Sequence, residues 1–324
     1  MAIAVRSFAK INVGLRIGPL RADKFHELRT VYQTLAVHDV IRIEARRGDG
    51  IEIHCHHPGV PADSNNTCWR VTERVLRALK LRKNIRIDIE KKLPVQGGLG
   101  AASSNGVATL LALEKLLRKR LTAHERLHIA AEVGSDLPLF LIGGTALGIG
   151  RGEEVYPLED LPRFHCVIAT PPVGVSTPAA FAEWDNNLSP AGKLTGSSPS
   201  DRMAKFSHAL YEWLNNSNFS ATGVPANARD RAEALLLDLV RTGIENDFEN
   251  VVFPMYPVIG QVKGVLVRSG ARYASLSGSG STVYGLFASR EAARKGALAV
   301  KATGVPATVT ATLRRKDYWN RLFV

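Results

Sequence analysis

Apolar and polar residues alternate in several short stretches of the chain, a pattern typical of half-buried β-strands. The clearest stretch covers residues 11–17, and its polar face carries Asn12, with Lys10 on the same face just before it. We therefore expect Lys10 and Asn12 to lie side by side on one strand. Further alternating stretches predict strands at residues 40–44, 51–56, 85–90, 273–277, 282–287 and 308–313.

Other stretches carry apolar residues at the three- and four-residue spacing of a helix. These predict helices at residues 67–81, 103–117, 123–133, 202–214, 229–241 and 256–268. Strands and helices alternate from the start of the chain, so the pattern predicts a mixed fold. An irregular, Pro-containing stretch around residues 156–163 suggests a division into two domains, residues 1–157 and residues 158–324. Residues 186–200 are rich in Asn, Ser, Pro and Gly and predict a mobile loop.

Composition places the chain among ordinary globular proteins, because 45% of its 324 residues are hydrophobic and 22% are charged. Its net charge of +12 would attract nucleic acid, an anionic membrane or a small polyanionic substrate. The basic residues are scattered along the chain, which favours solvated faces over a nucleic-acid patch. We therefore expect no nucleic-acid partner.

The cysteine pattern and the N-terminus bear on the cellular compartment. Cys55, Cys68 and Cys166 form no C-x-x-C pair, so neither a disulfide framework nor a zinc knuckle is indicated. The N-terminus lacks the apolar core of a signal peptide, and no uncharged apolar run reaches the roughly 18 residues of a membrane span. We expect a cytoplasmic protein without a membrane partner.

The strongest local signal for chemistry is the stretch PVQGGLGAASSN at residues 94–105, between a predicted strand and a predicted helix. Small residues let backbone amides approach an anion closely, and the helix that follows directs its positive end at the same point. The stretch is no Walker A motif, because no Gly-Lys-Ser/Thr follows. It is no Rossmann fingerprint either, because the third glycine is replaced by Ser103. A phosphate-binding loop is favoured, with a tight structural turn as the alternative.

A second loop of small residues, SLSGSGS at residues 275–281, lies between two predicted strands of the other half. Taken by itself it is more typical of a flexible hairpin. Two such loops in separate halves, however, suggest that a polyphosphate binds in a cleft between them.

Asp136 lies in the stretch GSDLPLFL, just after a predicted helix end. A carboxylate at this place is either a helix cap or a general base. A base needs a nearby cation to position it, and Lys10 is the candidate.

Phe25 and His26 are expected together in a loop, where they would suit stacking on and hydrogen bonding to a flat heterocycle, although a loop histidine often has no such role. His54, His56 and His57 lie around Cys55, but no carboxylate or Cys pair completes a ligand set. We therefore assign no metal ligands.

Three motifs stand in order along the chain: a strand that bears a lysine (AKINVGL), a P-x-x-x-G-L-G-x-x-S-S loop and a C-terminal SGSG loop. In this the chain resembles the GHMP kinase superfamily. RADKFHELRTVYQTL at residues 21–35, GVSTPAAF at residues 174–181 and NDFENVVFP at residues 246–254 are similar to the branch that phosphorylates 4-diphosphocytidyl-2-C-methyl-D-erythritol. The resemblance implies an α+β fold of two domains, a ribosomal-protein-like N-terminal domain that binds ATP and a ferredoxin-like C-terminal domain, with the site in the cleft between them.

The resemblance implies transfer of the γ-phosphoryl group of ATP, with Mg²⁺, to the 2-hydroxyl of a small substrate that carries a cytidine diphosphate group. Asp136 would be the catalytic base and Lys10 the cation beside it. ATP would contact Pro94, Gly97, Gly98, Leu99, Gly100, Ala101, Ala102, Ser103, Ser104 and Asn66, with Ser104 as a candidate Mg²⁺ ligand. The other substrate would contact Asn12, Phe25, His26, Thr177, Phe181, Gly278, Ser279 and Gly280.

Within this resemblance His26 would bind the cytosine edge, with the rings of Phe25 and Phe181 on the two faces of the base. Two alternatives stay open. One is a related kinase with another small alcohol as acceptor, homoserine or a phosphomevalonate-like molecule. The other is a GHMP-fold sensor that binds ligand without turnover. The sequence indicates no oligomeric state.

Overall fold

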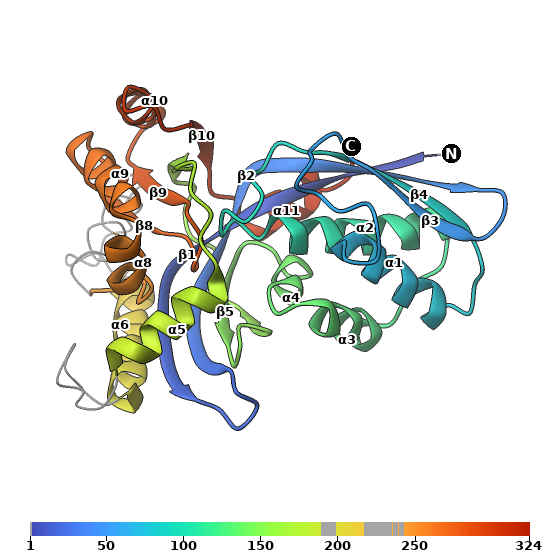
Figure 1. The fold of residues 1–324 in the computed structure, drawn as a ribbon, viewed down its shortest axis with the longest axis horizontal. Coiled ribbons are helices and arrows are strands. Elements are labelled where there is room, and N and C mark those ends of the chain that lie inside the picture. The colour runs from blue at the N-terminus through green and yellow to red at the C-terminus, as the bar shows by residue number, and fades with distance from the viewer. Residues whose placement is uncertain (1, 189–198, 217–234, 236–238, 240–242) are drawn as a thin grey trace.

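The computed structural model describes residues 2–188, 199–216, 235, 239 and 243–324, and shows a mixed α+β fold built on two sheets (Figure 1). This confirms the predicted fold class. The helix expected at residues 229–241 lies almost entirely outside the described residues. So does most of the loop expected at residues 186–200, of which residues 186–188 belong to a helix.

The first sheet has six strands in the order β3-β4-β2-β5-β6, with β1 paired to β2. Strands β3 and β4 are parallel and the other pairs are antiparallel. Helices α1 to α4 lie together on one side of this sheet, with α2 against β1 and β2 (Figure 1). The bounds are β1 (Ala2–Leu20), β2 (His26–Arg46), β3 (Gly50–His54), β4 (Asn84–Glu90), β5 (Thr145–Ile149), β6 (Glu154–Pro157), α1 (Thr67–Ala78), α2 (Ala101–Leu117), α3 (Ala123–Val133) and α4 (Leu137–Phe140).

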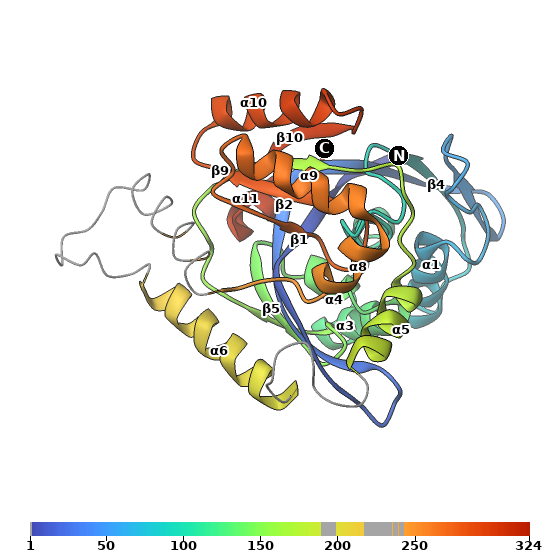
Figure 2. The ribbon, with the colours of Figure 1, turned by 60° about the vertical axis from the view of Figure 1, so that its left-hand side comes forward.

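The hairpin of β1 and β2 is far longer than the alternating pattern predicts, and it runs through both halves of the molecule (Figures 1 and 2). Residues 7–15 of β1 are all buried, because both faces of the strand are covered there. The alternation at residues 11–17 falls mostly inside this part, where the polar Asn12 is buried as well. Residues 2–9 are mostly apolar at both odd and even positions, so they show no polar alternation, and the pattern revealed only part of the strand. His26 also differs from expectation, because it is the first residue of β2 rather than a loop residue.

The second sheet has four antiparallel strands in the order β10-β7-β9-β8. Helices α9 and α10 pack on it, and α5 contacts α8 beside it (Figure 2). Strand β7 and helices α5 and α10 had no counterpart in the sequence prediction. The bounds are β7 (His165–Ala169), β8 (Tyr273–Leu276), β9 (Val283–Phe287), β10 (Ala307–Ala311), α5 (Thr177–Leu188), α6 (Pro199–Asn216), α8 (Glu249–Met255), α9 (Pro257–Arg268) and α10 (Arg290–Lys301).

The end of the chain returns to the first sheet, where α11 (Arg315–Arg321) buries Tyr318 in the same core as Phe8. The N–H of Arg6 donates to the carbonyl of Leu322, and the two termini lie close together (Figure 1). A further core cluster joins side chains of both halves. The division at residue 157 therefore stays a prediction, with a C-terminal segment that packs on the first half.

No single helix within the described ranges is long and apolar enough to cross a membrane. Helices α8 and α9 have the length and composition of a membrane span only when taken together, and the chain bends by 113° between them. The three cysteines are free thiols.

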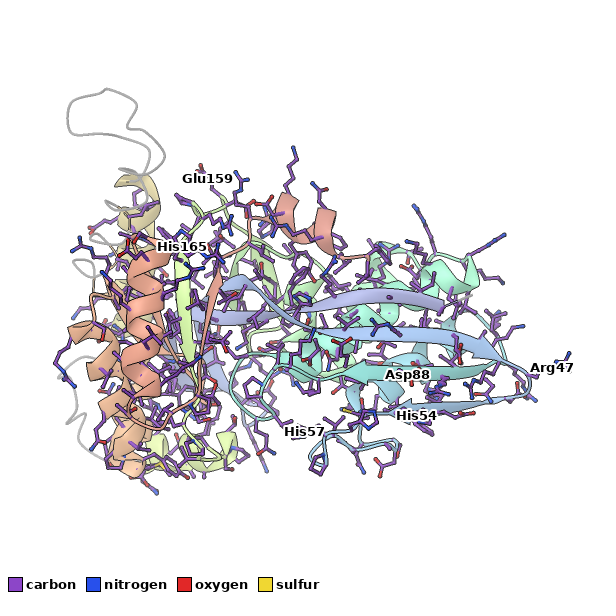
Figure 3. All side chains as sticks on the ribbon, turned by 90° about the horizontal axis from the view of Figure 1, so that it is seen from above. Arg47, His54, His57, Asp88, Glu159 and His165 are labelled. Carbon is purple, nitrogen blue, oxygen red and sulfur yellow. The ribbon has the colours of Figure 1, made fainter. Side chains whose placement is uncertain are left out.

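The histidine cluster lies along the edge of the first sheet, where His54, the last residue of the edge strand β3, is paired in register with Asp88 (Figure 3). His54 Nε2 is 3.8 Å from Glu52 Oε2, and both side chains are exposed. No group of three or more His, Cys, Asp or Glu side chains that could hold a metal ion occurs in the part of the chain that the structure describes.

Candidate active site

The predicted phosphate loop connects β4 to α2 and has the backbone that anion binding requires. Gly98 and Gly100 adopt left-handed φ angles of +79° and +67°, which favour glycine. Gly100 is the N-cap of α2 and offers no side-chain hydrogen bond to the helix. The first amides of α2 therefore lack a capping side chain and can donate to an anion at the positive end of the helix.

The second loop of small residues docks directly onto the first. The N–H of Thr282 donates to the carbonyl of Gly97 (3.2 Å), and the hydroxyl of Ser277 donates to the carbonyl of Gly98 (2.9 Å). A Cβ atom on Gly98 would overlap the carbonyl oxygen of Ser277. The buried Asn246 side chain donates to the carbonyls of Leu276 (2.9 Å) and Gly278 (2.8 Å). The second loop joins the antiparallel strands β8 and β9 and is held against the phosphate loop, as the suggestion of a cleft between the two loops requires.

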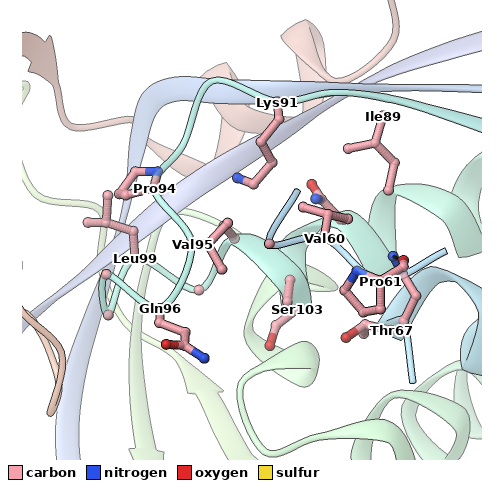
Figure 4. A pocket seen from close by; sticks show the side chains of 18 of the residues that line it. Val60, Pro61, Thr67, Ile89, Lys91, Pro94, Val95, Gln96, Leu99 and Ser103 are labelled. Atoms are coloured by element: carbon pink, nitrogen blue, oxygen red, sulfur yellow. Dashed lines mark hydrogen bonds between the residues drawn. The ribbon is translucent and has the colours of Figure 1, made fainter. Parts of the chain in front are cut away.

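A cavity of about 300 Å³ opens beside the phosphate loop (Figure 4). Val60, Pro61 and Thr67 form one side and the loop residues form the other (Figure 4). The predicted ATP residues that line it are Asn66, Pro94, Gly97, Gly98, Leu99, Gly100, Ala101, Ala102 and Ser103. Ser104 is buried and is not part of this lining.

Asn66 borders this cavity as expected, but its side chain is already engaged. Its Oδ1 accepts a hydrogen bond from the N–H of Cys68 (2.8 Å), which caps helix α1. Its Nδ2 donates to the carbonyl of Pro61 (2.6 Å). These two hydrogen bonds use one of the two N–H donors and one of the two oxygen lone pairs of the amide, so Asn66 fixes the cavity wall with its amide held in one orientation.

Lys10 and Asp136 lie together in a second, larger cavity of about 550 Å³. Lys10 Nζ is 3.2 Å from Asp136 Oδ2 and donates to Asn12 Oδ1 (2.7 Å). Lys10 is almost fully buried, whereas the Asp136 side chain is one-third exposed. Asp136 precedes α4 but caps it with no side-chain hydrogen bond, so the helix-cap alternative is wrong.

Tyr32, which the sequence analysis missed, completes the surroundings of Asp136. Its hydroxyl donates to Asp136 Oδ1 (3.1 Å). Burial, together with the negative charge of Asp136, raises the pKa of Tyr32 well above its usual value. The phenol therefore stays protonated and acts as a donor. Lys10 and Tyr32 hold one carboxylate oxygen each, which fixes the orientation of Asp136.

The residues expected to bind a base also line this cavity, and His26 lies six residues along β2 from Tyr32. The imidazole of His26 is parallel to the ring of Phe181, with 5.4 Å between centroids and 6° between planes. Phe25 is exposed at the turn between β1 and β2, and the guanidinium of Arg151 is 5.0 Å from its ring centroid. Thr177 Oγ1 is 2.6 Å from Ser279 Oγ, which joins α5 to the second glycine loop. All of these residues line the cavity.

His26 is held in place by the backbone. Its Nδ1 is 3.0 Å from the carbonyl oxygen of Gly18, which can only accept, so Nδ1 carries the proton. Its Nε2 is 3.0 Å from Asp185 Oδ1 without the alignment of a hydrogen bond. The ring therefore has a fixed orientation toward α5.

The two cavities meet at the phosphate loop. Gly98 and Gly100 line both of them, and Gly278 and Ser279 also line the larger one. Gly280 lies behind the loop, where a Cβ atom would overlap the backbone of residues 97 and 98. A polyphosphate in the smaller cavity would thus point its end at the larger cavity, on the side where Lys10 and Asp136 lie.

Leu28, Thr30, Tyr32 and Asp185 line the larger cavity and escaped the sequence analysis, although two signals for them exist. Leu28, Thr30 and Tyr32 follow the predicted His26 at every second position of β2, a spacing that the long strand would have revealed. Phe181 and Asp185 are four residues apart on α5 and therefore lie on one helix face.

Comparison with known proteins defines the class. Residues 66–144 match the model of the GHMP kinases N terminal domain, and residues 227–306 match that of the GHMP kinases C terminal domain. The chain belongs to the GHMP kinase family, whose members use ATP.

The similar proteins include two kinases that act on one particular substrate. The chain is 36% identical over 290 residues to a 4-diphosphocytidyl-2-C-methyl-D-erythritol kinase of Solibacter usitatus, which covers 89% of this chain and 82% of the relative. A crystal structure of 4-(cytidine 5'-diphospho)-2C-methyl-D-erythritol kinase is similar with a TM-score of 0.72 and 25% identity, covering 96% and 99% of the two chains. A homoserine kinase from Cytophaga hutchinsonii has a TM-score of 0.67 at 21% identity, covers 97% and 95% of the chains, and shares the fold.

Proposed function

We propose that this protein transfers the γ-phosphoryl group of ATP to the 2-hydroxyl of 4-diphosphocytidyl-2-C-methyl-D-erythritol, a step of the non-mevalonate route to isoprenoid precursors. One observation carries the proposal. A single cavity is lined both by the Lys10–Asp136 pair and by His26 stacked on Phe181. His26 lies six residues along β2 from Tyr32, which contacts Asp136. The cavity volume of about 550 Å³ suits a small ligand, and a cytidine diphosphate would place a base and an alcohol at opposite ends. The relatives of that name support the same acceptor.

In phosphoryl transfer the protein contributes mainly by positioning the reactants and stabilising charge. The backbone amides of residues 97–104 hold the ATP phosphates. The acceptor hydroxyl gives its proton to Asp136 as its oxygen bonds to the γ-phosphorus, and the bond to the bridging oxygen breaks to leave ADP. The ammonium of Lys10 offsets the negative charge that develops beside the carboxylate.

Basic side chains along the acceptor cavity account for part of the net positive charge. Lys10, Lys24 and Arg151 line it together with the carboxylates Asp136 and Asp185, which leaves a small positive excess. Both proposed substrates are polyanions, and a basic cleft raises their encounter rate. The charge of +12 therefore fits small polyanionic substrates.

The residues present fit magnesium that is bound mainly through the nucleotide. Mg²⁺ typically takes one or two protein oxygen ligands and completes its shell with phosphates and water. The hydroxyl of Ser103 borders the nucleotide cavity, whereas Ser104 is buried. We propose that Ser103, in place of the neighbouring Ser104 named in the sequence analysis, is a ligand for a Mg²⁺ ion that neutralises phosphate charge.

The direct test measures ADP formation by purified protein with ATP, magnesium and one of three acceptors. We expect turnover with 4-diphosphocytidyl-2-C-methyl-D-erythritol and none with homoserine or mevalonate. Turnover with homoserine or mevalonate alone would identify a kinase with another acceptor. Binding of ATP without turnover on any acceptor would support the ligand sensor instead.

Replacing His26 with alanine tests the part of the cavity that is proposed to bind the base. The variant loses a hydrogen-bonding ring held by the backbone, so we expect KM for the cytidine substrate to rise about tenfold, the equivalent of roughly 1.4 kcal/mol. KM for ATP should stay unchanged, because His26 does not line the nucleotide cavity. An equal rise in both constants would place the base elsewhere.

A further inference from the structure

A fully buried carboxylate, Asp39 of β2, lies beside the nucleotide cavity and has no part in the chemistry described above. It accepts hydrogen bonds from the backbone N–H groups of Lys92 (2.7 Å) and Leu93 (2.7 Å). It also accepts from Lys91 Nζ (2.8 Å) and from Asn105 Nδ2 (3.2 Å). Burying a charged carboxylate costs free energy unless hydrogen-bond donors compensate it. The donors around Asp39 supply this compensation.

The partners of Asp39 flank the phosphate loop on both sides. Residues 91–93 lead into the loop from β4, and Asn105 follows it in the first turns of α2. One carboxylate therefore ties together the entry and the exit of residues 94–100. We propose that Asp39 is a positioning residue that pre-forms the phosphate loop for ATP.

Lys91 supports this assignment, because its ammonium is already occupied. It pairs with Asp39 and donates to the carbonyl of Leu93, and its side chain is almost fully buried. Lys91 and Asn105 both line the nucleotide cavity, so the residues that Asp39 holds belong to the binding surface. The phosphates are then left to the loop amides, whose geometry depends on Asp39.

Pre-forming matters because a loop that is ordered before binding loses less conformational entropy when ATP binds. Neither Asp39 nor its partners line the acceptor cavity. A defect at Asp39 should therefore weaken the binding of ATP and leave the binding of the acceptor unaffected. A merely stabilising residue would lower the melting temperature and leave both affinities of the folded protein unchanged.

The inference rests on the proposed use of ATP but does not need the acceptor. The test measures binding of a non-hydrolysable ATP analogue by calorimetry to the full chain and to its Asp39→Asn variant, which keeps the size of the side chain. We expect the dissociation constant to rise at least tenfold. KM for the cytidine substrate, measured at saturating ATP, should change less than twofold.

Glu114 provides the matched control. It is also a buried carboxylate, but it lies on α2, at the end of the helix that is far from the phosphate loop. It accepts from the N–H of Leu121 (2.6 Å) and from Arg126 Nε (3.0 Å). Glu114→Gln should lower the melting temperature, as Asp39→Asn does, and leave the affinity for the analogue unchanged. Equal loss of affinity in both variants would overturn the proposal.

Should Asp39→Asn fail to fold, Asn105→Ala serves as a milder variant that leaves Asp39 three of its partners. We expect its dissociation constant for the analogue to rise about threefold, with KM for the acceptor unchanged. An unchanged dissociation constant in this variant would overturn the proposal. If the protein binds the analogue as expected but phosphorylates no acceptor, the proposed function fails and the assignment of Asp39 stands.

Discussion

The Asp136→Asn variant should lose about 10²–10⁴-fold in kcat and bind ATP almost as well as the wild type. An amide has the size of the carboxylate but cannot accept the proton of the acceptor hydroxyl, and general-base catalysis contributes a factor of this order. The neighbours of Asp136 do not suit an amide, since Tyr32 and Lys10 each contact one carboxylate oxygen as a donor. The NH₂ group of the new side chain would face one of these two donors.

Steady-state ADP release gives kcat, and calorimetry with a non-hydrolysable ATP analogue gives the affinity for nucleotide. Asp88→Asn serves as a control, because Asp88 is paired with Arg86 on β4 and lines neither cavity (Figure 3 labels Asp88). It should leave kcat unchanged. If Asp136→Asn kept more than about a tenth of the wild-type kcat, Asp136 would not be the base.

The parts of the site that the sequence revealed are those that short motifs encode. The predicted phosphate loop requires small residues and left-handed glycines within a few positions, so its composition favoured such a loop over a tight structural turn. Lys10 and Asn12 could be placed on one face because they are two residues apart on a strand. The pairing of Lys10 with Asp136, more than a hundred residues away, was inferred only because a catalytic base needs a nearby cation.

The parts that the sequence did not reveal depend on burial and on distant partners. β7 is buried almost throughout, so it shows no alternation, and α5 was taken partly for a loop because of its Asn-rich end. Tyr32 and Asp39 look like ordinary residues of a strand until the fold brings Asp136 to one and residues 91–105 to the other. Such roles arise from long-range contacts that no local pattern contains.

Replacing Gly98 with alanine should abolish most activity, with kcat/KM falling about a hundredfold or more for both substrates. An L-residue with a side chain at φ +79° carries a strain of about 1–2 kcal/mol, and here the added Cβ would also meet the backbone carbonyl of Ser277. The two glycine loops would have to separate. Because Gly98 lines both cavities, the separation would misalign ATP and acceptor together, and a shift of about 1 Å can cost about 10²-fold.

Gly48 separates strain from displacement, because it has φ +90° with no atom within 4 Å of an added Cβ. It lies in the turn after β2, next to Arg47, far from the phosphate loop (Figure 3). Gly48→Ala should therefore lower the melting temperature slightly, with kcat and both KM values unchanged. If Gly98→Ala behaved in the same way, the contact between the two loops would have no role in holding the substrates. A loss confined to Gly98→Ala would show that catalysis depends on the backbone contact between the two halves of the protein.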